Sequence, residues 1–230
     1  DLSLNTNNSV LLVPCFGDTT GIASLSTIGG SGYGTYSFYI DLAHSQNDST
    51  FYGLSSGYYF IYVEDANNCK DSLNVIISEP DEIIFSLSST NLLCNGDSTG
   101  TAEVANIAGG TMPYNYLWNN GATTDSIGGL LVGSYWLTVM DVNNCSALTD
   151  TVVITQPTIL QTIDSSNTSS SCGGTLLNGT AEIFAFGGTP PYSYLWNNGQ
   201  TATTAINLSA GTYTCITTDG NGCIEYDTVI

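Results

Sequence analysis

Carboxylates are the only side chains charged at neutral pH that this sequence holds in number. It has 20 Asp and Glu residues, one His and a single Lys or Arg. No hydroxyl or thiol nucleophile is paired with a base, so carboxylate chemistry is what remains. A pair of glycosidase carboxylates needs a cleft, which a domain of about 77 residues rarely provides. We therefore expect no catalytic residues and no enzymatic activity.

Three loops share the pattern Asp-x-Asn-x-Cys, and this pattern could hold a metal ion. Oxygen ligands at alternate positions suit Ca²⁺. The other interpretation is an Asx turn or tight hairpin that joins the last two strands, for which Asp and Asn are ordinary residues. The motif has few carboxylates, so we expect the turn and keep calcium as the alternative. The candidate metal ligands are Asp65, Asn67, Asp141, Asn143, Asp219 and Asn221.

Six of the seven cysteines fall at equivalent places, one early and one late in each of three similar stretches. This arrangement predicts one disulfide inside each stretch, closing a loop of about 50 residues that is worth on the order of 4 kcal/mol. Zinc would need clustered thiolates and histidines, which are missing. Disulfides imply an oxidising, extracellular compartment. The expected pairs are Cys15 with Cys69, Cys94 with Cys145, and Cys172 with Cys223.

The three stretches are copies of one unit. Residues 110–121 and 133–145 return closely as 188–199 and 211–223, and more weakly as 30–40 and 57–69. The period of about 77 residues is too long for a solenoid unit and suits a small domain with its own core. We expect repeat 1 at 1–80, which is divergent, repeat 2 at 81–157, and repeat 3 at 158–230, which lacks the last strand of the others. A Pro closes each of the first two repeats.

Composition excludes several partners. The formal net charge is −19 at pH 7 while 42% of residues are hydrophobic. Nothing can neutralise nucleic-acid phosphates or bind an anionic membrane surface. No run reaches the ~18 apolar residues of a membrane span, and no basic segment precedes an apolar core at the start. We expect neither an anchor nor a signal peptide within these residues, and no direct insertion into a membrane.

Within a repeat, apolar residues alternate and turn residues recur every 8 to 12 positions. In repeat 2 this predicts strands at 83–92, 101–107, 114–118, 123–127, 133–141 and 147–155, with a type I′ hairpin turn at Asn120-Gly121. Trp118 and Trp196 on the third strand should be core. A Gly followed by Tyr59, Tyr135 or Tyr213 in a late strand resembles a tyrosine corner. We therefore expect an all-β protein of three tandem immunoglobulin-like antiparallel β-sandwiches.

One family resemblance is specific. Gly-Gly-Thr-Pro-Pro-Tyr-x-Tyr-x-Trp-x-Asn-Gly, followed by Leu-x-x-Gly-x-Tyr and Asp-x-x-Gly-Cys, resembles the SprB-type repeat of giant surface adhesins in gliding Bacteroidota. The resemblance covers repeats 2 and 3 closely. It covers repeat 1 loosely, because residues 30–40 lack the Pro-Tyr and Trp-Asn-Asn-Gly elements. It implies export to the cell surface and a role in adhesion and gliding.

Several Asp residues precede Ser or Thr and then an apolar residue or Thr, which resembles the O-glycosylation signal of Bacteroidota. Chance is the alternative in a chain rich in Ser and Thr. Bulky sugars fit at exposed turns. The glycosylation candidates are Thr19, Ser49, Ser72, Ser98, Ser126, Thr151 and Thr228.

Strand alternation divides the aromatic residues of repeat 1 between two faces. If Tyr59 faces the core, its neighbours Tyr58, Phe60 and Tyr62 face outward, and Tyr39 joins them from the next strand. Exposed aromatics on one sheet suit a sugar platform or a protein contact, while packing between repeats is the alternative. Repeat 2 offers Trp136 at this place. Cys215 should be a buried, unreactive thiol, with an intermolecular disulfide as the alternative.

These features lead to a function and two alternatives. The first is an extracellular structural and adhesive repeat array that projects from a bacterial cell. The second is a carbohydrate-binding region that uses the aromatics of repeat 1 on a surface polysaccharide. The third is a self-assembling filament, in which the partner is another copy of the chain.

Overall fold

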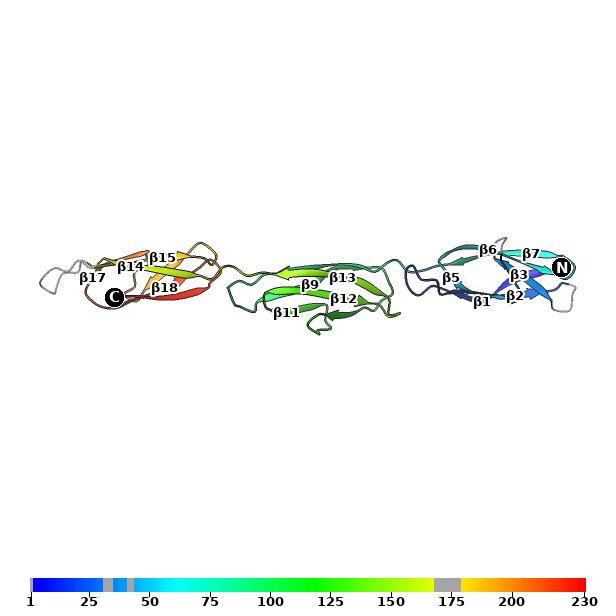
Figure 1. Cartoon of the computed structure of the whole chain (residues 1–230), viewed down its shortest axis with the longest axis horizontal. Coiled ribbons are helices and arrows are strands. Elements are labelled where there is room, and N and C mark those ends of the chain that lie inside the picture. The colour runs from blue at the N-terminus through cyan, green and yellow to red at the C-terminus, as the bar shows by residue number, and fades with distance from the viewer. Residues whose placement is uncertain (1, 31–34, 41–43, 168–178) are drawn as a thin grey trace. The chain divides into compact units, whose positions relative to one another are not determined.

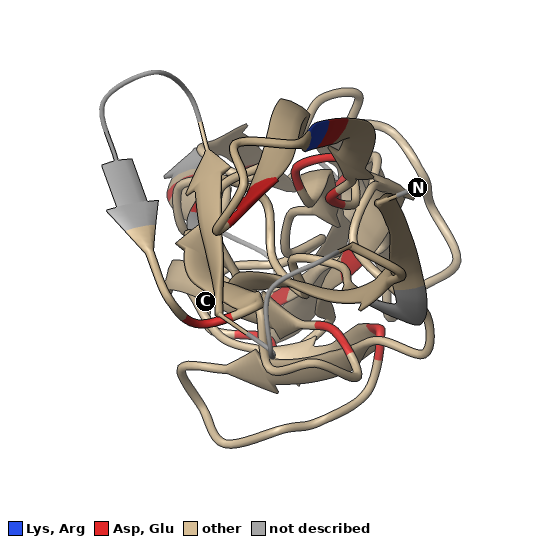
Figure 2. Ribbon diagram, turned by 90° about the vertical axis from the view of Figure 1, so that its right-hand side faces the viewer, with Lys and Arg blue, Asp and Glu red and all other residues tan. Residues whose placement is uncertain are grey.

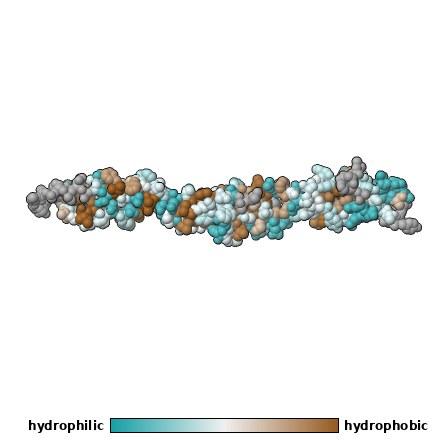
Figure 3. Space-filling model, viewed as in Figure 1, coloured by the Kyte–Doolittle hydropathy of each residue, from teal (hydrophilic) through white to brown (hydrophobic). Residues whose placement is uncertain are grey.

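The computed structural model describes residues 2–30, 35–40, 44–167 and 179–230, and these residues form antiparallel β-strands and no helix (Figure 1). The all-β fold class is therefore confirmed. Among the described residues, no helix is long and apolar enough to cross a membrane. Hydrophobic residues form separate patches between hydrophilic ones on the face that Figure 3 shows.

Repeat 1 consists of two sheets. The first has the order β1-β2-β5 and the second the order β4-β3-β6-β7, and they form two layers in Figure 1. The strands are β1 Ser3–Leu11, β2 Gly21–Ile28, β3 Tyr36–Ile40, β4 His44–Gln46, β5 Thr50–Leu54, β6 Gly57–Asp65 and β7 Lys70–Ile77.

The core of repeat 1 lies between these sheets, because each strand alternates apolar and polar residues. In β6, Ile61 and Val63 are buried, whereas Phe60, which precedes Ile61, is exposed. The buried cluster draws Ala23 and Leu25 from β2 in the first sheet and meets the residues of β6 from the second. Repeat 1 is thus a β-sandwich.

Repeats 2 and 3 each have two three-stranded sheets, so the expectation that repeat 3 lacks the last strand of repeat 2 is wrong: its final residues pair with the preceding strand. Their orders are β11-β9-β8 and β10-β12-β13 in repeat 2, and β14-β15-β17 and β16-β18-β19 in repeat 3. The strands are β8 Ile84–Thr90, β9 Gly100–Ala108, β10 Asn115–Trp118, β11 Ser126–Leu130, β12 Gly133–Met140, β13 Ser146–Ile154, β14 Gln161–Asn167, β15 Gly179–Phe186, β16 Ser193–Trp196, β17 Thr204–Leu208, β18 Tyr213–Thr218 and β19 Ile224–Val229.

Two compact units divide the chain, and their boundary runs through repeat 2. The first contains Asp1–Ser86, Ala105–Thr124 and Leu137–Asp150, and the second contains Leu87–Val104, Asp125–Trp136 and Thr151–Ile230. Repeat 1 and one part of repeat 2 therefore belong to the first unit. The remainder of repeat 2 and repeat 3 belong to the second. The domain boundaries at 80 and 157 stay a prediction.

The predicted tyrosine corners are confirmed. The hydroxyls of Tyr59, Tyr135 and Tyr213 donate to backbone oxygens four residues upstream, at 2.9, 3.1 and 3.2 Å. Trp118 and Trp196 are buried, as predicted, and their ring N–H groups donate to backbone oxygens.

The predicted type I′ hairpin at Asn120-Gly121 is wrong. Such a turn needs positive φ at both central residues, and only Gly121 has it, at 87°. The physical reason is the position of the glycine in the turn. Gly121 N–H donates to Trp118 O and Trp118 N–H donates to Ala122 O, both at 2.9 Å, so Gly121 is the last residue of a turn that begins at Trp118, and Asn120 needs no positive φ.

Candidate functional site: the junctions between repeats

The disulfides join successive repeats, so the predicted pairing within each repeat is wrong. Cys15 bonds Cys145 and Cys94 bonds Cys223, with Cα atoms 5.5 and 5.6 Å apart. Cys69 carries a free, exposed thiol. Cys172, which we expected to pair with Cys223, lies outside the described residues. Each bridge lies within one compact unit.

The geometry of a single repeat explains why Cys15 and Cys69 do not pair. Val13, two residues before Cys15, donates its backbone N–H to Ser78 just beyond the end of β7. Cys69 immediately precedes the start of β7. An eight-residue strand is about 26 Å long, whereas disulfide-bonded Cα atoms lie at most ~7 Å apart. The two cysteines of a repeat therefore stand at opposite ends of it.

The Asp-x-Asn-x-Cys loops present the late cysteines. Asp141 and Asp219 are buried, and Oδ1 of each accepts the backbone N–H groups two and four residues later at 2.8 to 2.9 Å. Oδ2 of Asp141 accepts Thr111 N–H, and Oδ2 of Asp219 accepts Thr189 N–H. These bonds fix the backbone of Cys145 and Cys223. They also hold each loop against a Gly-Gly-Thr segment, which is residues 109–111 in repeat 2 and 187–189 in repeat 3. The Asx-turn interpretation describes this arrangement.

The Asn of the same motif reaches the neighbouring repeat. Nδ2 of Asn143 donates to the backbone oxygen of Pro14 at 3.3 Å, and Nδ2 of Asn221 donates to that of Leu93 at 2.8 Å. Both acceptors directly precede the early cysteine. Each junction thus combines a disulfide with a hydrogen bond to the adjacent residue. Residue types alone do not reveal this pairing, because the acceptor is a backbone atom.

The early cysteines are held in a turn by the residue that precedes the closing Pro. Gly17 and Gly96 have positive φ values of 76° and 80°, which favour glycine. Gly17 N–H donates to Glu79 Oε2 at 2.7 Å, and Gly96 N–H donates to Gln156 Oε1 at 2.8 Å. Sequence reasoning missed this contact, although Glu or Gln before the Pro at both repeat ends was a usable signal.

The paired glycines of the Gly-Gly-Thr segment allow the chain to pass the start of the repeat closely. In repeat 3, Gly187 and Gly188 have φ values of 71° and 56°. A Cβ on Gly187 would collide with the backbone oxygen of Ile159. Gly188 N–H donates to Thr158 O at 2.9 Å. The segment is therefore fixed against the residues that follow the inter-repeat Pro157.

The calcium alternative for these loops stays a prediction. Among the residues that the structure describes, no three His, Cys, Asp or Glu side chains lie together as a metal site would require. Burial raises the pKa of Asp219, but the backbone N–H groups of Thr189, Cys223, Asn221 and Gly222 outweigh it and bring the pKa below its ordinary value. The ionised carboxylate is thus stabilised by the protein's own amides.

The outward aromatics of repeat 1 occupy one face, as predicted. The rings of Tyr39 and Tyr62 stack with centroids 4.6 Å apart and planes 8° from parallel, and Phe60 lies 6.5 Å from Tyr62. Tyr58 on the same strand is 86% exposed. Trp136 of β12 is 45% exposed. The structure therefore groups four of the five candidate ligand-binding residues and leaves Trp136 in another repeat.

The glycosylation candidates lie on the surface and stay predictions. Ser49 is half-buried, and the other six, Thr19, Ser72, Ser98, Ser126, Thr151 and Thr228, are exposed. Several of the preceding Asp side chains accept hydrogen bonds. Asp48 accepts Thr50 N–H at 3.0 Å, Asp71 accepts Leu4 N–H at 2.6 Å, Asp125 accepts the Ser126 hydroxyl at 3.2 Å, and Asp227 accepts the Thr162 hydroxyl at 3.0 Å.

Cys215 is buried and free, as predicted. Burial raises the pKa of its thiol above the ordinary value, outweighing hydrogen bonds that lower it. At neutral pH this thiol is protonated and shielded. The single basic side chain, Lys70, pairs with Glu64 at 3.3 Å, and in Figure 2 the one blue residue adjoins red ones.

Comparison with protein families identifies two of the repeats. Residues 86–123 and 165–201 match the SprB repeat, one region in repeat 2 and the other in repeat 3. A comparison with curated proteins found no match.

Solved structures share only a general likeness with the chain. A C-terminal fragment of intimin in complex with the intimin-binding domain of its translocated receptor is 11% identical, with 73% of this chain and 66% of that chain covered and a TM-score of 0.33. Domains 4–9 of the surface layer protein SbsC are 14% identical, with coverages of 100% and 46% and a TM-score of 0.30. The eight N-terminal immunoglobulin domains of Down syndrome cell adhesion molecule are 12% identical, with coverages of 84% and 31% and a TM-score of 0.33. The chain spans 31% to 66% of these three structures.

Proposed function

The chain carries SprB repeats, and from this premise we propose that it is a structural segment of an extracellular, adhesive protein on a bacterial surface. Its role is to transmit force between the cell and an attachment point without unravelling. Gliding motility is one process that would load such a segment. The observation that carries the proposal is the pair of disulfides that cross from one repeat to the next.

The two bridges limit how far the chain can be drawn out. They close loops with sequence separations of 130 and 129 residues, and these loops overlap between Cys94 and Cys145. Three segments of chain therefore run between one bridge and the other, and the shortest of them sets the maximum distance. That segment has about 50 residues, so the unfolded chain extends by roughly 70 residues, or ~250 Å, between its ends.

Without the bridges, all 230 residues would extend to about 800 Å. Single-molecule stretching of the oxidised chain from its two ends therefore distinguishes a force-bearing segment from unlinked domains. We expect a limit near 250 Å, which rises to about 800 Å after reduction. Extension of the oxidised protein to the full length would refute the proposal.

A variant with Cys69→Ser and Cys172→Ser makes this test specific for the pairing. Bridges between repeats use neither residue, so the limit should stay near 250 Å. Bridges inside each repeat would leave one loop of about 50 residues closed, and the extension would reach ~600 Å.

A second candidate function rests on the aromatic face of repeat 1. Stacked Tyr39 and Tyr62, with Phe60 and the exposed Tyr58 beside them, offer an apolar surface on which a sugar ring of a surface polysaccharide could stack. Isothermal titration or a glycan array with Tyr58→Ala and Phe60→Ala tests it. Binding should fall at least tenfold, while Tyr226→Ala, an exposed aromatic of repeat 3, leaves it unchanged. Equal binding by all variants would remove this function.

A further inference from the structure

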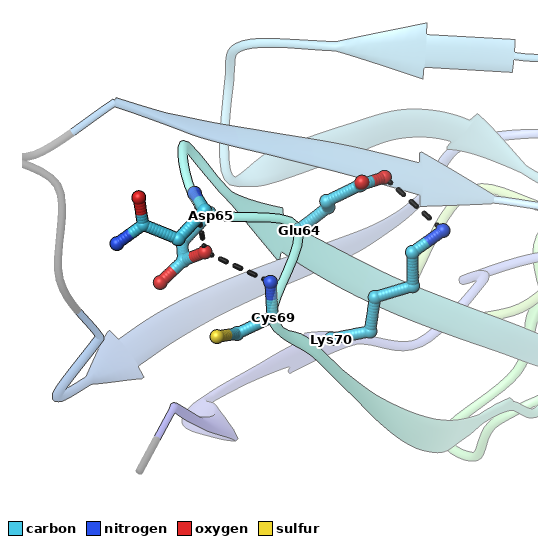
Figure 4. A network of polar contacts seen from close by, with 5 residues as sticks. Glu64, Asp65, Cys69 and Lys70 are labelled. Atoms are coloured by element: carbon cyan, nitrogen blue, oxygen red, sulfur yellow. Dashed lines mark hydrogen bonds and ion pairs between the residues drawn. The ribbon is translucent and has the colours of Figure 1, made fainter.

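Cys69 is a junction cysteine without its partner. Its thiol is free and exposed, and Figure 4 shows the sulfur directed away from the Lys70 side chain. Cys145 and Cys223 occupy the same place in their repeats, and both are bonded to the early cysteine of the preceding repeat.

The loop around Cys69 is already formed like the two bonded loops. Asp65 Oδ1 accepts the N–H groups of Asn67 and Cys69 at 2.9 Å (Figure 4). Asp65 N–H donates to Cys69 O at 3.0 Å, as Asp141 N–H does to Cys145 O. Asn68 has a φ of 62° and Asn144 of 64°. The backbone that presents a late cysteine for bonding is therefore complete in repeat 1.

Charge at this loop favours one kind of partner. At the junction of repeats 1 and 2, Ser146 lines the same cavity as Asp18, which lies three residues after the early Cys15. Lys70 follows Cys69 as Ser146 follows Cys145, and its side chain is 59% exposed. A turn of the Cys-x-Gly-Asp type would thus bring its carboxylate near Lys70, the chain's single Lys or Arg, which also pairs with Glu64 at 3.3 Å.

We propose that Cys69 forms a disulfide with the early cysteine of a further SprB repeat, placed one period upstream in the same polypeptide. The partner is a Cys-x-Gly-Asp turn like those of Cys15 and Cys94, docked on the Asp65–Cys69 loop and paired with Lys70. This inference rests on the proposed function, because it extends the cross-linked array by one junction.

Bond formation requires an oxidant, which is a low-molecular-weight disulfide such as oxidised glutathione. The Cys69 thiolate attacks one sulfur, releasing a glutathione thiolate and leaving a mixed disulfide. The thiolate of the partner cysteine then attacks the Cys69 sulfur and expels the second glutathione thiolate. Two protein thiols are oxidised and one disulfide is reduced to two thiols, which take up the two protons.

The test uses the whole chain with a copy of residues 81–158 fused before Asp1. The copy carries Ser98→Ala as a mass mark, so its early cysteine is distinguishable from Cys94. After folding in glutathione buffer, peptide mapping without reduction should find the marked cysteine joined to Cys69. Cys69 should also lose at least nine-tenths of its reaction with a maleimide, relative to the 230-residue protein.

Three outcomes would overturn the inference. Cys69 could stay reactive in the fused chain, the marked cysteine could bond elsewhere, or Cys69 could form disulfides between molecules instead. The Cys15–Cys145 and Cys94–Cys223 links are read in the same map. Their absence would refute the proposed function, whereas their presence with a free Cys69 would refute only this inference.

The contribution of Lys70 can be measured separately. In the fused chain, Lys70→Glu places like charges together at the docked turn, so we expect the link to form at least threefold more slowly at low salt. Lys70→Ser copies the residue of repeat 2 and should retain the link. An unchanged rate for Lys70→Glu would remove the charge argument from the proposed docking.

Discussion

Replacement of Asp141 should destabilise repeat 2, because this residue holds the loop that ends the repeat and fixes the backbone of Cys145. Its side chain is 0% exposed. Its carboxylate accepts three backbone N–H groups, from Thr111, Asn143 and Cys145, at 2.8 to 2.9 Å. Asp141→Ala leaves these donors without this acceptor.

The magnitude follows from those bonds. A hydrogen bond to a charged group contributes about 1.5–3 kcal/mol, and buried donors left unsatisfied cost a further amount. The three bonds share one carboxylate and are not additive, so we expect a loss on the order of 4 kcal/mol for Asp141→Ala. Asp141→Asn keeps one oxygen acceptor and should lose roughly half as much.

Urea unfolding followed by tryptophan fluorescence measures this loss. In a Trp196→Phe background, the signal comes from Trp118 and Trp136, which both lie in repeat 2. With a slope near 1 kcal/mol per molar urea, a loss on the order of 4 kcal/mol should lower the midpoint for Asp141→Ala by roughly 4 M. Asp18→Ala changes an exposed carboxylate and should stay within about 0.5 kcal/mol of the parent. A loss below about 1 kcal/mol for Asp141→Ala would refute the reasoning, because the buried carboxylate would then not hold the loop.

Three further results are expected. Cys15→Ser with Cys145→Ser opens a loop of 130 residues and should lower the free energy of unfolding by up to about 5 kcal/mol in the chain-entropy model, read from urea curves against the oxidised parent; no difference would show that the bridge is absent. The pKa of Asp219 lies below its ordinary value in the folded protein, so its stabilising effect is present above about pH 4 and is lost as the pH falls through the folded pKa. Between about pH 5 and pH 3, the melting temperature should therefore fall more in the parent than in Asp219→Asn. Equal falls would contradict this. Gly187→Ala puts a Cβ against the backbone oxygen of Ile159 at positive φ and should cost about 2 kcal/mol or more, measured as a lower melting temperature; a change under 0.5 kcal/mol would show that the segment relaxes.

The strands and the core could be predicted from the sequence, because burial imposes a two-residue period that the residue types reveal. In repeat 2 the predicted strand at 133–141 matches Gly133–Met140, and Tyr135 makes its corner hydrogen bond. The inward Trp118 and the outward aromatics of β6 followed from the same alternation. Strand ends were less predictable, and the strand expected at 123–127 is Ser126–Leu130.

The junctions could not be predicted in the same way. Equivalent positions in each repeat reveal that Cys15 and Cys69 belong to two classes, but spacing along the chain does not show which end of a sandwich each class occupies. That depends on the length and direction of β7, which separates the two cysteines. The hydrogen bond from Asn143 to Pro14 O uses a backbone acceptor. Because every residue has a backbone oxygen, the sequence does not indicate which one accepts.

Disulfide mapping of the native 230-residue protein tests the central claim most directly. Digestion without reduction, followed by mass spectrometry, should identify linked peptides containing Cys15 with Cys145 and Cys94 with Cys223, and a Cys69 that reacts with a maleimide. Peptides that join Cys15 to Cys69 and Cys94 to Cys145 would contradict the account, because each repeat would then be closed on itself and no disulfide would join one repeat to the next.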